Sequence, residues 1–276
     1  MENMKNDQEY FGLTNDIIFG WIMKNDDNCL AIIRSILPEL NITKIVRNDS
    51  QHDVTPITSS RGVRFDVVVQ DDQQRFYDVE MQVENNGDLG KRTRYYQSQI
   101  DNETLLKGQS FRDLKESYVI FLCSFDPFGY GLRLYKFHQY EDKHKELQLD
   151  TQSHVIFVNA KGTRGKITSD LKAIIDVMNQ KNNQDNQLAT KLRQEIDYYN
   201  QDSRKRREIM DYLTKLEDER MVGQKVGQRN MLKSMITSMN KQGVNRSLIF
   251  QIVKDASKGE LTDQQVNQLI DGVAKS

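Results

Sequence analysis

Apolar and polar residues alternate in two short runs between residues 62 and 84, which a polar turn joins. This period of two is typical of β-strands, so the stretch predicts a β-hairpin. One face of the second run is entirely apolar. The opposite face contains three acids, and its members are Phe76, Asp78, Glu80, Gln82 and Glu84. The pattern therefore predicts a strand with one apolar face and one face rich in carboxylates.

The predicted turn centres on Asp72 and Gln73, so residues whose numbers sum to about 146 lie opposite one another. Asp66 then faces Glu80, with the two Cα atoms roughly 4.5–5.5 Å apart. Two carboxylates this close repel each other unless they share a cation, and Mg²⁺ prefers such oxygen ligands. The alternative is a half-buried strand that shows water an ordinary polar face.

The remaining pattern predicts a mixed α/β sheet flanked by helices. Helical spacing and capping residues predict helices, whereas short apolar or alternating runs predict strands. The run at 117–125 is continuously apolar, as expected of a central strand, and the run at 131–140 alternates like an edge strand. The expected helices cover 14–23, 29–37 and 88–107, and the further expected strands cover 41–49 and 154–160.

From residue 168 onward the composition shifts to helix formers, which predicts a domain boundary between 1–167 and 168–276. We expect helices at about 188–219 and 228–240, with the two glycines of 222–227 forming a break between them. Residues 243–273 predict two short helices with the spacing of a helix-turn-helix, for which a simple packed helix pair is the alternative. The helical C-terminal region is also our hypothesis for contacts in a homo-oligomer.

Charge and composition restrict the function classes. Acids and bases nearly cancel, to a net charge of −1, so any DNA contact must come from local basic patches. The two cysteines, Cys29 and Cys123, stand apart within apolar runs and predict buried thiols. No apolar run approaches the ~18 residues of a membrane span, and the N-terminus lacks a signal-peptide pattern. We therefore expect a cytoplasmic protein with no membrane partner.

Several motifs in order resemble one nuclease family. An aspartate on one strand, followed by D-x-E-x-Q on the next, is similar to the PD-(D/E)XK nuclease superfamily, and in particular to its Rpn branch of recombination-promoting nucleases and transposases. The flanking motifs are also similar to that branch, and they are TNDIIF at 14–19, RTRYYQSQID at 92–101, LLKG at 105–108 and YVIFLCSFDPFG at 118–129. The resemblance implies a restriction-endonuclease-like fold and a metal-dependent DNA endonuclease.

The resemblance also implies a set of site residues. Asp66, Glu80 and the backbone carbonyl of Met81 would bind Mg²⁺, with Mn²⁺ as an alternative ion, and Asp16 would complete the metal shell. An acid in the first turn of a helix, as Asp16 is, also has a purely structural explanation in the helix dipole. Gln82 stands where most of the superfamily has lysine. Because glutamine does not titrate, Gln82 is expected to orient the attacking water without deprotonating it.

Bases and aromatic residues are interleaved at the start of the helix predicted after the hairpin. Lys91, Arg92 and Arg94 are therefore candidates for contacts with DNA phosphates, and a solvated helix face is the alternative. The competing function class is a noncatalytic DNA-binding or oligomerisation protein of transposase origin. Both acids of the hairpin are present in the sequence, which favours the nuclease.

Overall fold

The computed structural model describes residues 9–54, 63–182 and 185–274, which form two compact units. The first unit reaches Arg206 and the second begins at Arg207. Among the described residues, no helix is long and apolar enough to cross a membrane. The predicted boundary at residue 167 lies within the first unit, because the helices that follow it, α4 (Ser169–Met178) and α5 (Gln187–Gln201), pack against α2 and α1.

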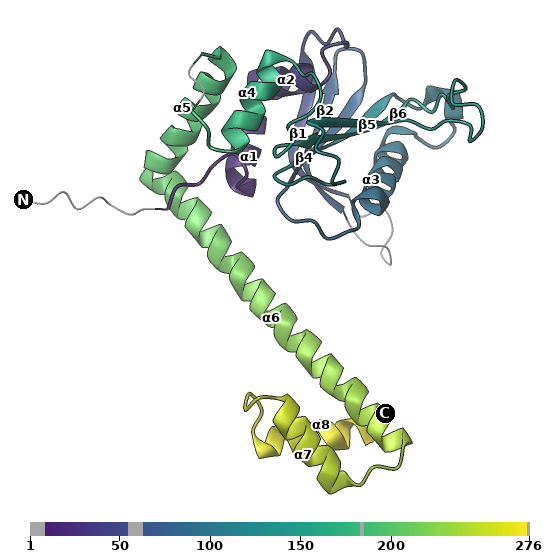
Figure 1. Ribbon diagram of the computed structural model, residues 1–276, viewed down its shortest axis with the longest axis vertical. Coiled ribbons are helices and arrows are strands. Elements are labelled where there is room, and N and C mark those ends of the chain that lie inside the picture. Colours follow the sequence, from purple (N-terminus) through teal and green to yellow (C-terminus); the bar gives the residue numbers. More distant parts are fainter. Residues whose placement is uncertain (1–8, 55–62, 183–184, 275–276) are drawn as a thin grey trace, which may run out of the picture. The chain divides into compact units, whose positions relative to one another are not determined.

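A mixed sheet of six strands with helices on both faces forms the first unit (Figure 1). The strand order is β1-β2-β3-β4-β6-β5, in which β3, β4 and β6 run parallel and the other neighbours run antiparallel. The strands are β1 (Ile45–Val54), β2 (Val63–Asp71), β3 (Phe76–Gln82), β4 (Ser117–Cys123), β5 (Leu134–Phe137) and β6 (Ser153–Asn159). The predicted α/β class, the buried central strand β4 and the edge strand β5 are confirmed.

The two faces of the sheet are covered by different helices (Figure 1). One face packs against α3 (Leu89–Thr104), whose Leu89, Tyr96 and Ile100 share a core with Val119 and Phe121 of β4. The other face lies against α1 (Asp16–Met23), α2 (Asp26–Ile36) and α4. Both N-terminal helices begin at an asparagine, Asn15 or Asn25, whose side chain accepts hydrogen bonds from the first turn.

The second unit contains most of α6 (Ser203–Lys241), followed by α7 (Arg246–Ala256) and α8 (Asp263–Ala274). Its core joins the C-terminal part of α6 to the two short helices, and the buried members are Leu232, Ile236, Ile249, Val253, Val266, Leu269 and Ile270. A reciprocal cap precedes α8, in which the Gln265 backbone N–H donates to the Thr262 hydroxyl and the Gln265 side chain accepts from the Thr262 N–H.

The predicted break at 222–227 is wrong, because α6 is continuous for 39 residues. The chain breaks earlier, at Asp202, whose carboxylate accepts hydrogen bonds from the N–H groups of Arg204 and Lys205 and so caps the start of α6. Gly223 and Gly227 lie inside the helix. A glycine weakens a helix interior by about 1 kcal/mol but does not by itself end it.

Candidate active site

Asp66 on β2 and Glu80 on β3 lie side by side in the predicted hairpin. The paired residues, such as Val67 with Val79 and Val68 with Asp78, have numbers that sum to 146, so the predicted register is confirmed. The Asp66 N–H donates to Glu80 Oε1 at 2.9 Å, and the Met81 N–H donates to Asp66 Oδ2 at 2.9 Å. Each carboxylate is therefore positioned by a backbone group of the opposite strand.

The polar face of β3 is buried, contrary to the expectation of a solvent-facing acidic strand. All seven residues of β3 are buried, and the exposed fractions are 0% for Asp78, 3% for Glu80 and 8% for Gln82. The sequence pattern is that of a half-covered strand, but β3 lies between β2 and β4 and α3 covers its polar face. The alternative of acids that are merely solvated is therefore wrong for Asp78 and Glu80, while Glu84 beyond the strand is exposed.

Burial and mutual repulsion raise the pKa values of the acids on this face. Burial, followed by the charge of Asp66, raises the pKa of Glu80 to about 8. Burial also raises the pKa of Asp78, with the charge of Glu80 as the next cause. Among the residues that the structure describes, the partner of the Asp78 carboxyl group is another acid, Glu80, and no N–H or hydroxyl group donates to either of its oxygens. The cluster thus has more buried acceptor oxygens and negative charge than its surroundings satisfy.

Arg92 is the cation that the structure places beside these acids. Its Nη2 lies 3.4 Å from Glu80 Oε2 and donates to the Tyr96 hydroxyl at 2.9 Å, while Nη1 donates to Gln82 Oε1. The guanidinium carbon also lies 5.2 Å from the ring centroid of Phe121. Arg92 therefore points toward the site, unlike the exposed Lys91 and Arg94 on the same helix. Its contact with a DNA phosphate stays a prediction.

Gln82 makes hydrogen bonds through both ends of its amide. Oε1 accepts from Arg92, and Nε2 donates to the backbone carbonyl of Glu84 at 2.6 Å. The predicted orientation of a water by Gln82 therefore competes with two protein contacts. The arrangement instead holds the Arg92 guanidinium against the amide oxygen of Gln82.

The donor set fits a hard divalent cation. Asp66 and Glu80 present carboxylate oxygens, and the Met81 carbonyl leaves β3 on the same side as its N–H, which binds Asp66. Mg²⁺ is commonly bound by one or two carboxylates, with water and phosphate as the remaining ligands. In the described parts of the chain, no three or more His, Cys, Asp or Glu residues form a metal-binding group by themselves. Water and substrate would therefore supply the remaining ligands.

Asp16 occupies the first turn of α1, with an exposed side chain, and α1 contacts β2, the strand of Asp66. The structure brings together Asp66, Glu80, Met81 and Gln82. The metal-binding role of Asp16 stays a prediction.

Two residues of the site have surroundings that the sequence did not predict. Asp78 belonged to the polar face for which solvation was the alternative, and Arg92 was a candidate for contacts with DNA phosphates. The i, i+4 spacing of Arg92 and Tyr96 shows that the two side chains share a face of α3. Nothing local to that helix indicates that this face covers the acids.

Comparison with known proteins gives one finding. The family model described as PD-(D/E)XK nuclease family transposase matches residues 14–222, which is more than half of the 276-residue chain. A search of curated proteins and of solved structures gave no match. The matched range includes the whole sheet and the acids of β2 and β3.

Proposed function

Because the chain belongs to the PD-(D/E)XK nuclease family transposases, we propose that it is a metal-dependent endonuclease that hydrolyses DNA phosphodiester bonds in recombination or mobile-element transfer. The observation that carries this proposal is the interlocked pair of Asp66 and Glu80 beside the fully buried carboxyl group of Asp78. Mg²⁺, or Mn²⁺ in its place, would be held by Asp66, Glu80 and the Met81 carbonyl. The bound ion would acidify a water molecule and stabilise charge on the scissile phosphate.

Three side chains, those of Glu80, Asp66 and Arg92, would have separate roles in the reaction. Glu80, ionised when the cation is bound, would accept a proton from the attacking water. The Asp66 carboxylate would bind the ion in a fixed orientation, because it accepts a hydrogen bond from the Met81 N–H. Arg92, held by Gln82 and Tyr96, would place a positive charge next to the phosphate, which Gln82 itself lacks.

DNA would approach the edge of the sheet where the parallel strands end. Gln82, Cys123 and Asn159 are aligned at the carboxyl ends of β3, β4 and β6, so the loops after these strands lie at one edge. The loop after β6 contains exposed bases, among them Arg164 and Lys166, and α3 adds the exposed Lys91 and Arg94. These groups would contact backbone phosphates, which position DNA without reading its sequence.

Isosteric substitutions test the two acids without disturbing the hairpin. Asp66→Asn and Glu80→Gln each keep an oxygen that accepts the existing backbone hydrogen bond but remove the charge needed for a cation. We expect each variant to reduce Mg²⁺- or Mn²⁺-dependent nicking of supercoiled plasmid by ~100-fold or more, equivalent to about 3 kcal/mol of transition-state stabilisation. Calorimetric titration of Mn²⁺ should show correspondingly weaker binding.

Glu84→Gln is the matched control, because this acid follows the same strand but is exposed. It should retain both cleavage and Mn²⁺ binding. Equal cleavage by parent and both site variants would contradict the assignment of Asp66 and Glu80. A parent protein that binds DNA without cutting it in either metal would instead support the noncatalytic alternative.

A further inference from the structure

The middle of α6 has no packing partner among the described residues of the second unit. Every residue from 214 to 231 is exposed, a length of about 27 Å at 1.5 Å per residue. Large apolar side chains are nevertheless exposed on α6 from residue 210 to residue 231. Those with exposed fractions of 39–66% are Met210, Leu216, Met221, Val222, Val226 and Met231. Most helices in proteins depend on packing for stability, and this one also contains Gly223 and Gly227. These observations indicate that a partner covers α6.

The charges of α6 show which partner fits. Residues 208–219 contain five acids and one lysine, a net charge of −4, whereas residues 220–233 contain four bases and no acid, a net charge of +4. Ion pairs join neighbouring turns at Lys215 with Glu219, at 4.0 Å, and at Arg220 with Glu217, at 3.9 Å. Both pairs are long and exposed, so they leave most of the charge of residues 209–219 and of residues 220–233 available to another molecule.

We propose that two copies of the chain associate through antiparallel α6 helices, with the acidic half of each against the basic half of the other. A two-fold axis between residues 220 and 221 places residues 208–219 of each copy opposite residues 222–233 of the other copy. The same alignment pairs Met210 with Met231. A parallel pair would instead place like charges together along the whole contact. The four basic residues at 204–207 would face the uncharged 234–237 and meet no like charge.

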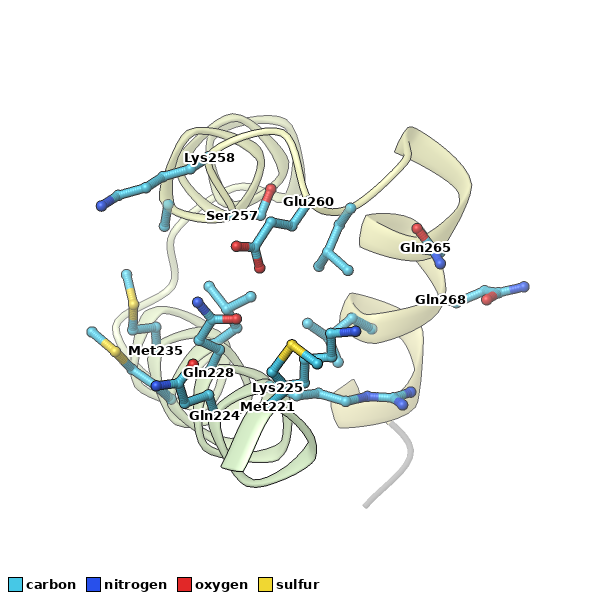
Figure 2. A pocket seen from close by; sticks show the side chains of 16 residues that line it. Met221, Gln224, Lys225, Gln228, Met235, Ser257, Lys258, Glu260, Gln265 and Gln268 are labelled. Carbon is cyan, nitrogen blue, oxygen red and sulfur yellow. The ribbon is translucent and has the colours of Figure 1, made fainter. Parts of the chain in front are cut away.

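A groove in the second unit provides a binding surface for the acidic half of the partner's α6, residues 208–219. It has a volume of about 1080 Å³ and lies between α6, the α7–α8 connection and α8 (Figure 2). Its lining includes the bases Lys225, Arg229 and Lys258 but only one acid, Glu260. Met221, Met231 and Met235 add adaptable apolar surface, which suits a helix with exposed Met210 and Leu216.

Charge reversal tests the proposal. One variant carries Glu217→Lys, Asp218→Lys and Glu219→Lys, and a second carries Lys225→Glu, Arg229→Glu and Lys233→Glu. By sedimentation equilibrium at low salt, we expect the parent at twice the 32.2 kDa chain mass and each variant at the mass of one chain. The chain with all six substitutions should regain the dimer, because its halves are again opposite in charge. Circular dichroism of each variant checks that the helices remain.

Cysteine cross-linking tests the orientation. In an antiparallel pair, a mixture of Met210→Cys and Met231→Cys chains forms a disulfide between copies under mild oxidation, whereas Met210→Cys alone forms little. Strong cross-linking of Met210→Cys alone would show a parallel pair and overturn the proposal. A parent that stays a single chain at about 100 µM in low salt, or triple variants that remain dimers, would also overturn it.

Discussion

At the scale of one residue, Glu80 makes the free energy of unfolding depend on pH. In the folded state its pKa is about 8, whereas the ordinary value is 4.5, so the folded protein binds the proton more tightly than the unfolded chain. The stabilisation is complete below about pH 4.5 and is lost as the pH rises toward 8. We expect metal-free protein to lose roughly a few kcal/mol of unfolding free energy across this interval, measured by urea denaturation.

Glu80→Gln should weaken this pH dependence, because the amide stays neutral throughout the interval. At pH 8 the metal-free variant should be more stable than the parent, and added Mn²⁺ should stabilise only the parent. A lower stability of Glu80→Gln at pH 8 would mean that the site favours the ionised carboxylate. That result would contradict a raised pKa of Glu80 in the folded protein.

Arg92 and Gln82 allow a second test at the residue scale, in which the positive charge is moved from α3 to β3. Arg92→Gln removes the only cation bonded to Glu80 among the described residues, so we expect ~10–100-fold slower cleavage with Mn²⁺ binding retained. Adding Gln82→Lys to that variant returns a positive charge from β3 and should recover part of the rate. Single-turnover cleavage of a labelled duplex measures both. A double variant no faster than Arg92→Gln would show that the charge acts only from the α3 position.

The α3 helix has two functions at the scale of the element. Its inner face covers the acids through Arg92 and Tyr96, and its outer face presents Lys91 and Arg94. Lys91→Gln with Arg94→Gln should weaken binding to unrelated DNA sequences and flatten the log–log salt dependence by about 0.9 for each phosphate that is no longer neutralised. Mn²⁺ affinity should not change, because neither residue contacts the acids.

Lys107→Gln is the control for this double variant, since Lys107 is an exposed base just beyond the C-terminal end of α3. It should leave the salt dependence unaltered. If the double variant has the parental slope, the two residues are a solvated helix face, and the basic loop after β6 becomes the candidate for DNA contact.

The whole molecule consists of two units with separate cores. The core of the second unit depends on Ile236, which is fully buried against α7 and α8. Ile236→Ala should destabilise this unit by about 2–5 kcal/mol, because the variant buries less apolar surface and leaves a cavity. Hydrogen exchange should show faster opening of α7 and α8, with Mn²⁺ binding in the first unit unchanged. Ser238→Ala, on the exposed side of the same helix, should have little effect.

The sequence by itself determined the features that depend on local periodicity. A period of two and a polar turn were sufficient for the hairpin register, and hence for the proximity of Asp66 and Glu80. The order of helices and strands from α1 to β6 followed from apolar spacing and capping residues. These features depend on residues close in the chain, so the pattern contains the necessary information.

Only the tertiary structure decided what covers each face. Alternation shows that Asp78 and Glu80 share a side of β3, but it does not show that α3 closes over that side and raises their pKa values. The inward direction of Arg92 depends on the same packing. The continuity of α6 through Gly223 and Gly227 is also decided beyond the local pattern, because two glycines weaken a helix without fixing where it ends. Burial is a property of distant segments brought together, whereas the sequence pattern is read one segment at a time.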